Sequence, residues 1–223
     1  MKIIIIIAVS FLLCSKLNAQ VSIAPIFTIE GYSDGLGGPD MTPVKYDQGC
    51  SGWVNTKTTS CRVRLRGASS PHNVIATSST GVLPTNGVAY GLSFSSISPS
   101  SVVGYYIELL TDDGLPLWSS NLVTFPTSSA IIYDFTTSLS SAYSTVGNQQ
   151  KDLYNNASYF AMYSGDLVRT DTIDQADQDE MDTQIMNYAS GCAARGDLNG
   201  DGNTDLIDDA ILSPNIGRWV QRP

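Results

Sequence analysis

The chain has 223 residues, which is enough for one large domain or two small ones. A hydrophobic content of 42 % supports a packed core, and the abundance of serine, threonine and glycine favours β-structure with many turns over a helical bundle. The net charge of −9 and the lack of a basic patch argue against nucleic acid as a partner.

The first nineteen residues have the pattern of a secretory signal peptide. Met1-Lys2 is a short basic start, Ile3–Leu13 is apolar, and Leu17-Asn18-Ala19 precedes a predicted cleavage after Ala19. The apolar run is short for a membrane span, and no second long apolar segment follows. We therefore expect an exported protein, extracellular or at the cell surface, with the periplasm as the alternative.

Residues 20–137 read as a series of short strands separated by turns. The clearest is Thr59–Gly67, where Cys61, Val63 and Leu65 alternate with three arginines, as in a strand with one buried face. The expected strands lie at 22–32, 59–67, 74–79, 89–95, 102–110, 117–125 and 131–136. About seven strands at this spacing predict an immunoglobulin-like antiparallel β-sandwich, with a closed barrel as the alternative. Residues 138–162 are polar and weakly patterned, and we interpret them as a linker.

Three cysteines remain after the signal peptide. In an oxidising compartment Cys50 and Cys61 are the natural pair, because they would close a short loop. Cys192 would then be left over, either buried or available to another chain.

A calcium loop is the strongest motif of the sequence. Counting Asp197 as position 1 of GDLNGDGNTDLID, oxygen-bearing side chains fall at positions 1, 3, 5, 9 and 12, and Gly202 falls at position 6. This is the ligand schedule of a twelve-residue EF-hand loop, in which position 7 contributes its backbone carbonyl. The predicted Ca²⁺ ligands are Asp197, Asn199, Asp201, Asn203, Asp205 and Asp208.

A weaker copy of this loop precedes it by thirty-one residues. Gly165-Asp166-Leu167 recurs as Gly196-Asp197-Leu198, and the same offset places Asp166, Asp174 and Asp177 at calcium positions 1, 9 and 12. Positions 3, 5 and 6 do not fit, so this loop offers fewer ligands. Helices are expected at 175–188 and from Ile207 to Pro214, and residues 163–223 form the predicted second domain. Twelve of its residues are acidic and four are arginine, which suggests charge awaiting a cation.

Paired Asp-rich loops of this kind, with GDLNGDGNTDLIDD as the better copy, resemble a dockerin-type pair of EF-hands. With EGY, YYIELL, LPLWSSNLVTF, IIYDFTTSLSSAY, AMYSGDL and WVQRP, the chain is similar to secreted bacterial proteins that join one β-sandwich to a C-terminal dockerin-like repeat. The resemblance implies extracellular Ca²⁺ binding and, for dockerins, docking onto a cohesin partner in polysaccharide-degrading assemblies. At positions 10 and 11, where dockerins carry partner-contacting Ser/Thr or Lys/Arg, this chain has Leu206 and Ile207.

Three functions follow as hypotheses. The first is a non-catalytic, calcium-stabilised module for adhesion or assembly at the cell surface. The second is a dockerin-bearing component that binds or degrades polysaccharide, with glycan contacts through aromatics such as Trp53, Trp118, Tyr105 or Tyr106. The third is a subunit that self-assembles into fibres or a surface layer. No pair of carboxylates stands out for glycoside hydrolysis and no nucleophile elbow is present, so we expect no enzyme.

Overall fold

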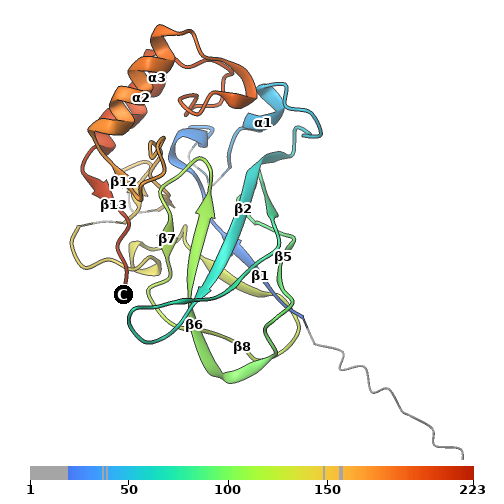
Figure 1. Ribbon diagram of the computed structural model, residues 1–223. Coiled ribbons are helices and arrows are strands. Elements are labelled where there is room, and N and C mark those ends of the chain that lie inside the picture. The colour runs from blue at the N-terminus through green and yellow to red at the C-terminus, as the bar shows by residue number, and fades with distance from the viewer. Residues whose placement is uncertain (1–19, 37, 39, 148, 156–157) are drawn as a thin grey trace, which may run out of the picture.

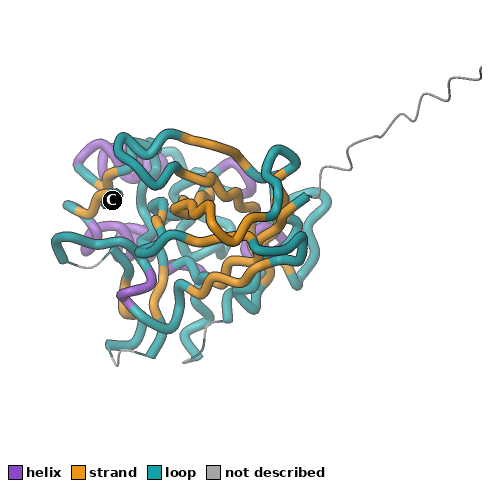
Figure 2. Tube along the Cα trace, turned by 90° about the horizontal axis from the view of Figure 1, so that it is seen from below, coloured by secondary structure: helices purple, strands orange, loops and turns teal. Residues whose placement is uncertain are grey.

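A computed structural model describes residues 20–223 except 37, 39, 148 and 156–157. The predicted signal peptide lies outside the described residues. The described part is mainly β, with two packed sheets and a helical C-terminal region beside them (Figure 1, Figure 2). Among the described residues, no helix is long and apolar enough to cross a membrane.

The larger sheet is antiparallel and has the order β3-β2-β6-β7, with β4 pairing with β2 and β8 pairing with β6. The smaller sheet has the order β5-β1-β9, in which β1 and β9 run parallel. The strands of the two sheets are β1 (Val21–Ile26), β2 (Lys57–Arg66), β3 (Val74–Thr77), β4 (Gly81–Pro84), β5 (Leu92–Phe94), β6 (Ser100–Thr111), β7 (Leu117–Trp118), β8 (Val123–Phe125) and β9 (Ile131–Asp134).

The two sheets enclose one hydrophobic core. Strand β2 shows why: Cys61, Val63 and Leu65 alternate on its inner face and are all buried. Val21 and Ile23 of β1 point into the same core from the other sheet. The predicted β-sandwich is thus confirmed as a mainly β, two-sheet arrangement. Strand β4 was missed because Gly81 and Pro84 in so short a segment look like a turn.

The C-terminal region, by which we mean the chain after β9, contains two helices and two small strand pairs. The helices are α2 (Gln175–Met186) and α3 (Leu206–Leu212), and the strand pairs are β10 (Lys151–Asp152) with β11 (Phe160–Ala161) and β12 (Thr172–Ile173) with β13 (Arg218–Trp219). Single helical turns are spread over the whole described chain. They are η1 (Glu30–Tyr32), α1 (Val44–Asp47), η2 (Leu139–Ser141), η3 (Gly191–Ala193) and η4 (Ser213–Asn215).

A second core joins this region to the sandwich. Trp118 of β7 and Leu115 of the preceding loop pack with Met181 of α2 and Leu212 of α3. Residues of the segment that we interpreted as a linker also pack, since Gln150 and Phe160 are buried. The C-terminal region therefore covers part of the outer face of the larger sheet.

The Glu30-Gly31-Tyr32 turn is a further anchor for the C-terminal region. Glu30 Oε2 accepts a hydrogen bond from Asn215 Nδ2 at 2.6 Å, and Gly31 N donates to Ser164 Oγ at 3.1 Å. A Cβ on Gly31 would lie 2.0 Å from the carbonyl oxygen of Leu198, so only glycine fits there.

Candidate metal centre in the paired aspartate loops

The second loop, which we define as residues 197–208, is organised around two buried carboxylates. Asp197 is 2 % exposed and Asp208 is fully buried. Asp197 Oδ1 accepts from Gly200 N at 2.7 Å, and its Oδ2 accepts from Gly202 N at 2.8 Å. Asp208 Oδ1 accepts from Leu198 N and Asn199 N, and its Oδ2 accepts from Asp205 N. The loop thus folds its own N–H groups onto the carboxylates of positions 1 and 12.

The remaining predicted ligands lie at the loop surface. Asn199 Oδ1 accepts from Asp201 N at 2.8 Å, and Asp201 Oδ1 accepts from Asn203 N at 3.0 Å. Asp205 caps α3, where its side chain accepts from Ile207 N at 2.7 Å as part of a capping box with Asp208. All six predicted residues are therefore brought into one compact loop.

The first loop, residues 166–177, repeats this pattern at an offset of thirty-one residues. Asp166 accepts from Thr170 N and Asp171 N, as Asp197 does from its own loop, and Asp177 accepts from Val168 N and Asp174 N, as Asp208 does. Asp174 caps α2 with the same capping box. The duplication inferred from the sequence is thus present in the hydrogen bonds as well as in the residues.

Three of the loop carboxylates have pKa values above the ordinary value of an aspartate. Burial, and after it the charge of Asp197, raises the pKa of Asp208 to about 6, although three backbone N–H groups act against the rise. Burial likewise raises the pKa of Asp197 and that of Asp166. Among the described residues, neither Asp197 nor Asp208 forms an ion pair with lysine or arginine.

The donor set fits a hard cation. Carboxylates and side-chain amides are the oxygen ligands that Ca²⁺ prefers, and two of the carboxylates lack any other positive partner. Within the described part of the chain, no three Asp, Glu, His or Cys side chains converge as a metal cluster. The carboxylates instead point at backbone N–H groups, so binding would require them to exchange these contacts for the ion.

The turn α1 holds the second loop against the sandwich. Gln48 Nε2 donates to Asp197 Oδ2 at 2.8 Å, and a Cβ on Gly200 would lie 2.2 Å from Val44 Cγ2. Cys50 forms a disulfide with Cys192, with Cα atoms 5.5 Å apart. Sequence reasoning missed these contacts because their partners lie about 150 residues apart.

The predicted Cys50–Cys61 disulfide is wrong. Cys61 is a free thiol buried on the inner face of β2, where burial raises its pKa to about 12, whereas Cys50 lies in a loop beside α1. Short sequence separation favoured the wrong pair. The sequence did contain a signal against this pair, because the alternation places Cys61 on the same buried strand face as Val63 and Leu65.

The aromatic glycan surface that we considered is not assembled either. Trp118 is buried, and the guanidinium of Arg66 stacks over its ring at 5.1 Å. Tyr106 packs against the same ring, and Tyr105 packs against the core of the sandwich.

Comparisons with known proteins add little. No family model matches the chain, and no curated protein matches it. Two solved structures of a type II cohesin-X-dockerin complex from Acetivibrio cellulolyticus, a C-terminal and an N-terminal interface mutant, contain similar chains. The first has 12 % identity and a TM-score of 0.46, covering 89 % of this chain and 97 % of that one. The second has 13 % identity and a TM-score of 0.44, covering 90 % and 95 %. Likeness at this level carries no argument about function.

Proposed function

We propose that this protein is an exported, non-catalytic module whose C-terminal region is a dockerin-like pair of EF-hand loops with a structural Ca²⁺ site in the second loop. The observation that carries the proposal is the pair of buried carboxylates, Asp197 and Asp208, which have raised pKa values and no cationic partner in the described part of the chain. Hydrogen bonds offset only part of the cost of burying two carboxylates that have no cationic partner among the described residues, and a bound cation would offset more of it.

The residues of the second loop have separate tasks in this proposal. Asp197, Asn199, Asp201 and Asp208 supply side-chain oxygens, and Asn203 supplies its backbone carbonyl. Calcium, when bound, supplies the positive charge that the buried carboxylates lack. Gln48 positions Asp197 through the 2.8 Å hydrogen bond, so the ligand at position 1 is oriented by the sandwich itself.

The site is structural rather than a switch. The segment just before the loop is joined to the sandwich by the Cys50–Cys192 disulfide, and the loop itself packs on Val44 through Gly200, so it is attached at two points. Binding would turn the carboxylates from backbone N–H groups to the ion, while these attachments keep the loop in place on the sandwich. Its occupation would stabilise the contact between the C-terminal region and the sandwich. The first loop, with Asp166, Asp174 and Asp177, has fewer ligands, and we expect it to bind weakly or not at all.

The site can be tested by thermal unfolding with calcium, with magnesium and with a chelator. A ligand that binds only the folded state at a hundredfold excess over its Kd stabilises it by about 2–3 kcal/mol. We expect the melting temperature to fall on chelation and to recover with calcium but not with magnesium at equal concentration. An unchanged melting temperature in all three conditions would contradict the proposal.

We place the protein outside the cytoplasm, in extracellular or cell-surface assembly or adhesion. The predicted signal peptide supports this placement, and a disulfide fits an oxidising compartment. Mass spectrometry of protein recovered from an exporting host should find Gln20 as the first residue. Recovery of the chain with Met1 retained, in the cytoplasmic fraction only, would contradict export.

A further inference from the structure

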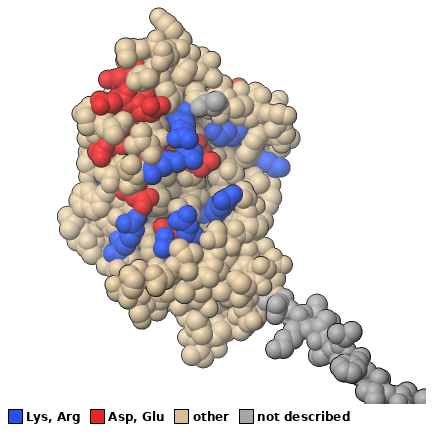
Figure 3. Space-filling view, in the orientation of Figure 1, with Lys and Arg blue, Asp and Glu red and all other residues tan. Residues whose placement is uncertain are grey.

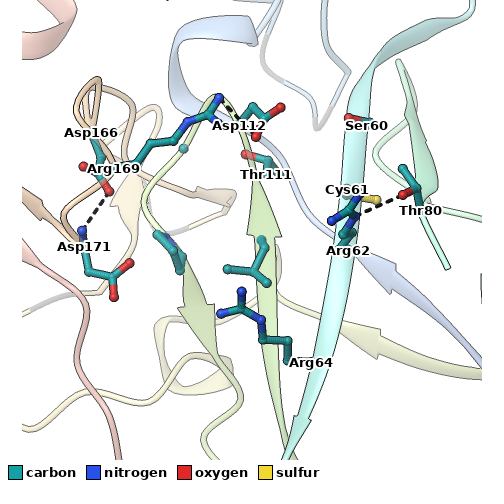
Figure 4. Close-up of a pocket in the computed structure, with 13 residues that line it drawn as sticks. Ser60, Cys61, Arg62, Arg64, Thr80, Thr111, Asp112, Asp166, Arg169 and Asp171 are labelled. Carbon is teal, nitrogen blue, oxygen red and sulfur yellow. Dashed lines mark hydrogen bonds and ion pairs between the residues drawn. The ribbon is translucent and has the colours of Figure 1, made fainter. Parts of the chain in front are cut away.

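A polar cleft of about 360 Å³ separates strand β2 from the first loop (Figure 4). Ser60, Arg62 and Arg64 of β2 form one wall, and Asp166, Arg169 and Asp171 of the first loop form the other. On the surface, lysine and arginine side chains gather across this face beside an acidic area (Figure 3).

Two arginines of this cleft have donors to spare. Arg62 Nε donates to Thr80 Oγ1 at 3.0 Å, and among the described residues Arg62 pairs with no carboxylate. Arg64 Nη1 lies 3.5 Å from Glu108 Oε2, but Arg66 already binds that oxygen through Nε at 2.7 Å and Nη2 at 2.6 Å. Glu108 is therefore neutralised by Arg66, and the positive charge of Arg64 remains largely available.

Two of the three acids in the lining are paired with arginines. Asp112 pairs with Arg169 at 3.1 Å, and Asp171 pairs with Arg222. The carboxylate of Asp166 accepts two backbone N–H groups of its own loop. Among the described residues, Asp166 is the one acid of the lining without an arginine partner, and Arg62 and Arg64 on β2 are the two guanidinium groups that no carboxylate neutralises. The unpaired charge that faces the cleft is therefore more positive than negative, although the whole chain carries a net charge of −9.

The opposite wall is held in an unfavourable backbone conformation. Arg169 and Asp171 have φ values of +58° and +64°, and their equivalents in the second loop are Gly200 and Gly202, with φ of +77° and +98°. Glycine adopts this region freely, whereas arginine and aspartate do so at a cost. The ion pair between Arg169 and Asp112 is about half exposed, and such pairs contribute little to stability. Compared with the glycine of the second loop, Arg169 brings a guanidinium group to the cleft.

We propose that this cleft binds the carboxylate of an acidic saccharide, with Arg62 and Arg64 as its principal partners and Arg169 as a donor from the opposite wall. Guanidinium groups bind carboxylates through paired, charge-assisted hydrogen bonds. The hydroxyls of Ser60, Thr80 and Thr111 lie in the same lining and match sugar hydroxyls. An acidic peptide would leave these hydroxyls without partners, which favours a hydroxylated ligand.

The test is calorimetric titration of the protein with tetragalacturonate, at low and high salt. A fully methyl-esterified tetragalacturonate and tetra-aspartate serve as the neutral and peptide probes. We expect binding of the uronate only, weakened by salt and by at least about tenfold in Arg62→Gln. Arg218→Gln is the matched control, because Arg218 stacks over Tyr163 away from the cleft, and it should bind as the wild type does.

Arg169→Gly separates ligand binding from a purely structural role. Glycine fits the left-handed backbone, so this variant should melt no lower than the wild type and still bind the uronate several-fold more weakly. A lower melting temperature with unchanged binding would assign Arg169 to structure and overturn its part in the site. Absence of uronate binding, equal binding of tetra-aspartate, or unchanged binding by Arg62→Gln would overturn the proposal as a whole.

Discussion

Gln178 Nε2 donates a hydrogen bond to Asp209 Oδ1 at 2.7 Å, and these two residues occupy equivalent positions thirty-one residues apart in the duplicated loops. A contact between equivalent residues lies where two related halves face each other. Here it joins α2 to α3, each just past the capping box of its own loop. The two halves are therefore paired with each other, although only the second has the full set of proposed calcium ligands.

A Gly31→Ala variant tests how tightly the C-terminal region packs on the sandwich. The added Cβ would overlap the carbonyl oxygen of Leu198, 2.0 Å away, and the backbone would have to move. We expect a loss of about 1–3 kcal/mol in the free energy of unfolding, measured by chemical denaturation. Gly67→Ala is the control, because its Cβ would meet only ordinary contacts at 3.8 Å and beyond. Equal effects in the two variants would contradict the close approach at Gly31.

Thiol labelling distinguishes the two disulfide pairings. With Cys50 joined to Cys192, the remaining thiol of the chain that begins at Gln20 is Cys61, which is buried and has its pKa raised to about 12 by burial. We expect no alkylation of the folded protein at pH 8 and one alkylated cysteine after unfolding without reductant. Rapid labelling of Cys192 in the folded protein would restore the pairing that sequence separation favoured.

Removal of the disulfide should cost stability as well. The bond closes a loop with a sequence separation of 142 residues, and in the chain-entropy model a loop of that length contributes about 4–5 kcal/mol. A Cys50→Ser, Cys192→Ser double variant should unfold at a lower denaturant concentration than the wild type. Because α1 then holds the second loop only through Gln48 and Val44, its calcium affinity should fall too. Unchanged stability would mean that the disulfide is dispensable.

The metal-free protein should be more stable at pH 5 than at pH 7.5. Burial raises the pKa of Asp208 from 3.8 in the unfolded chain to about 6 in the folded protein. Its contribution is fully present below pH 4 and is lost as the pH rises through 6, because the folded state then carries the charge without a partner. We expect a difference of about 1–3 kcal/mol, measured by chemical denaturation in chelator.

Asp208→Asn is the control for this pH effect. The side-chain amide of asparagine cannot accept all the backbone hydrogen bonds that the carboxylate accepts, so the variant is less stable at every pH. The two proteins are therefore compared by the change in unfolding free energy between pH 5 and pH 7.5. This change should be smaller in the variant. With saturating calcium the wild type should show the opposite trend, because protons compete with the metal for the same carboxylate. A wild type whose metal-free stability rises from pH 5 to pH 7.5 would contradict the assignment.

The sequence predicted what local patterns control. The alternation of Cys61, Val63 and Leu65 defined β2 and its buried face, and the regular offset of Asp166 and Asp197 defined the paired loops. The helices follow from the capping aspartates, and the structure ends them at Met186 and Leu212, close to the predicted limits.

Contacts between distant segments could not be predicted in the same way. Gly31 meets Leu198, and Gln48 meets Asp197, across more than 140 residues each, and no local period marks such pairs. Among the apolar residues of the C-terminal region, Ile173, Met181 and Leu212 are buried, but Ile207 and Trp219 are about half exposed. The buried residues pack with Trp118 and Leu115 of the sandwich, which lie far from them in the sequence.

Calcium titration by calorimetry tests the central claim most directly. The wild type should bind about one Ca²⁺ per chain. Asp201→Ala, which removes an exposed ligand without opening the core, should weaken binding by at least about tenfold. Asp179→Ala, an exposed acid on α2 outside both loops, should bind as the wild type does. No binding at millimolar calcium, or wild-type affinity in Asp201→Ala, would contradict a calcium site in the second loop.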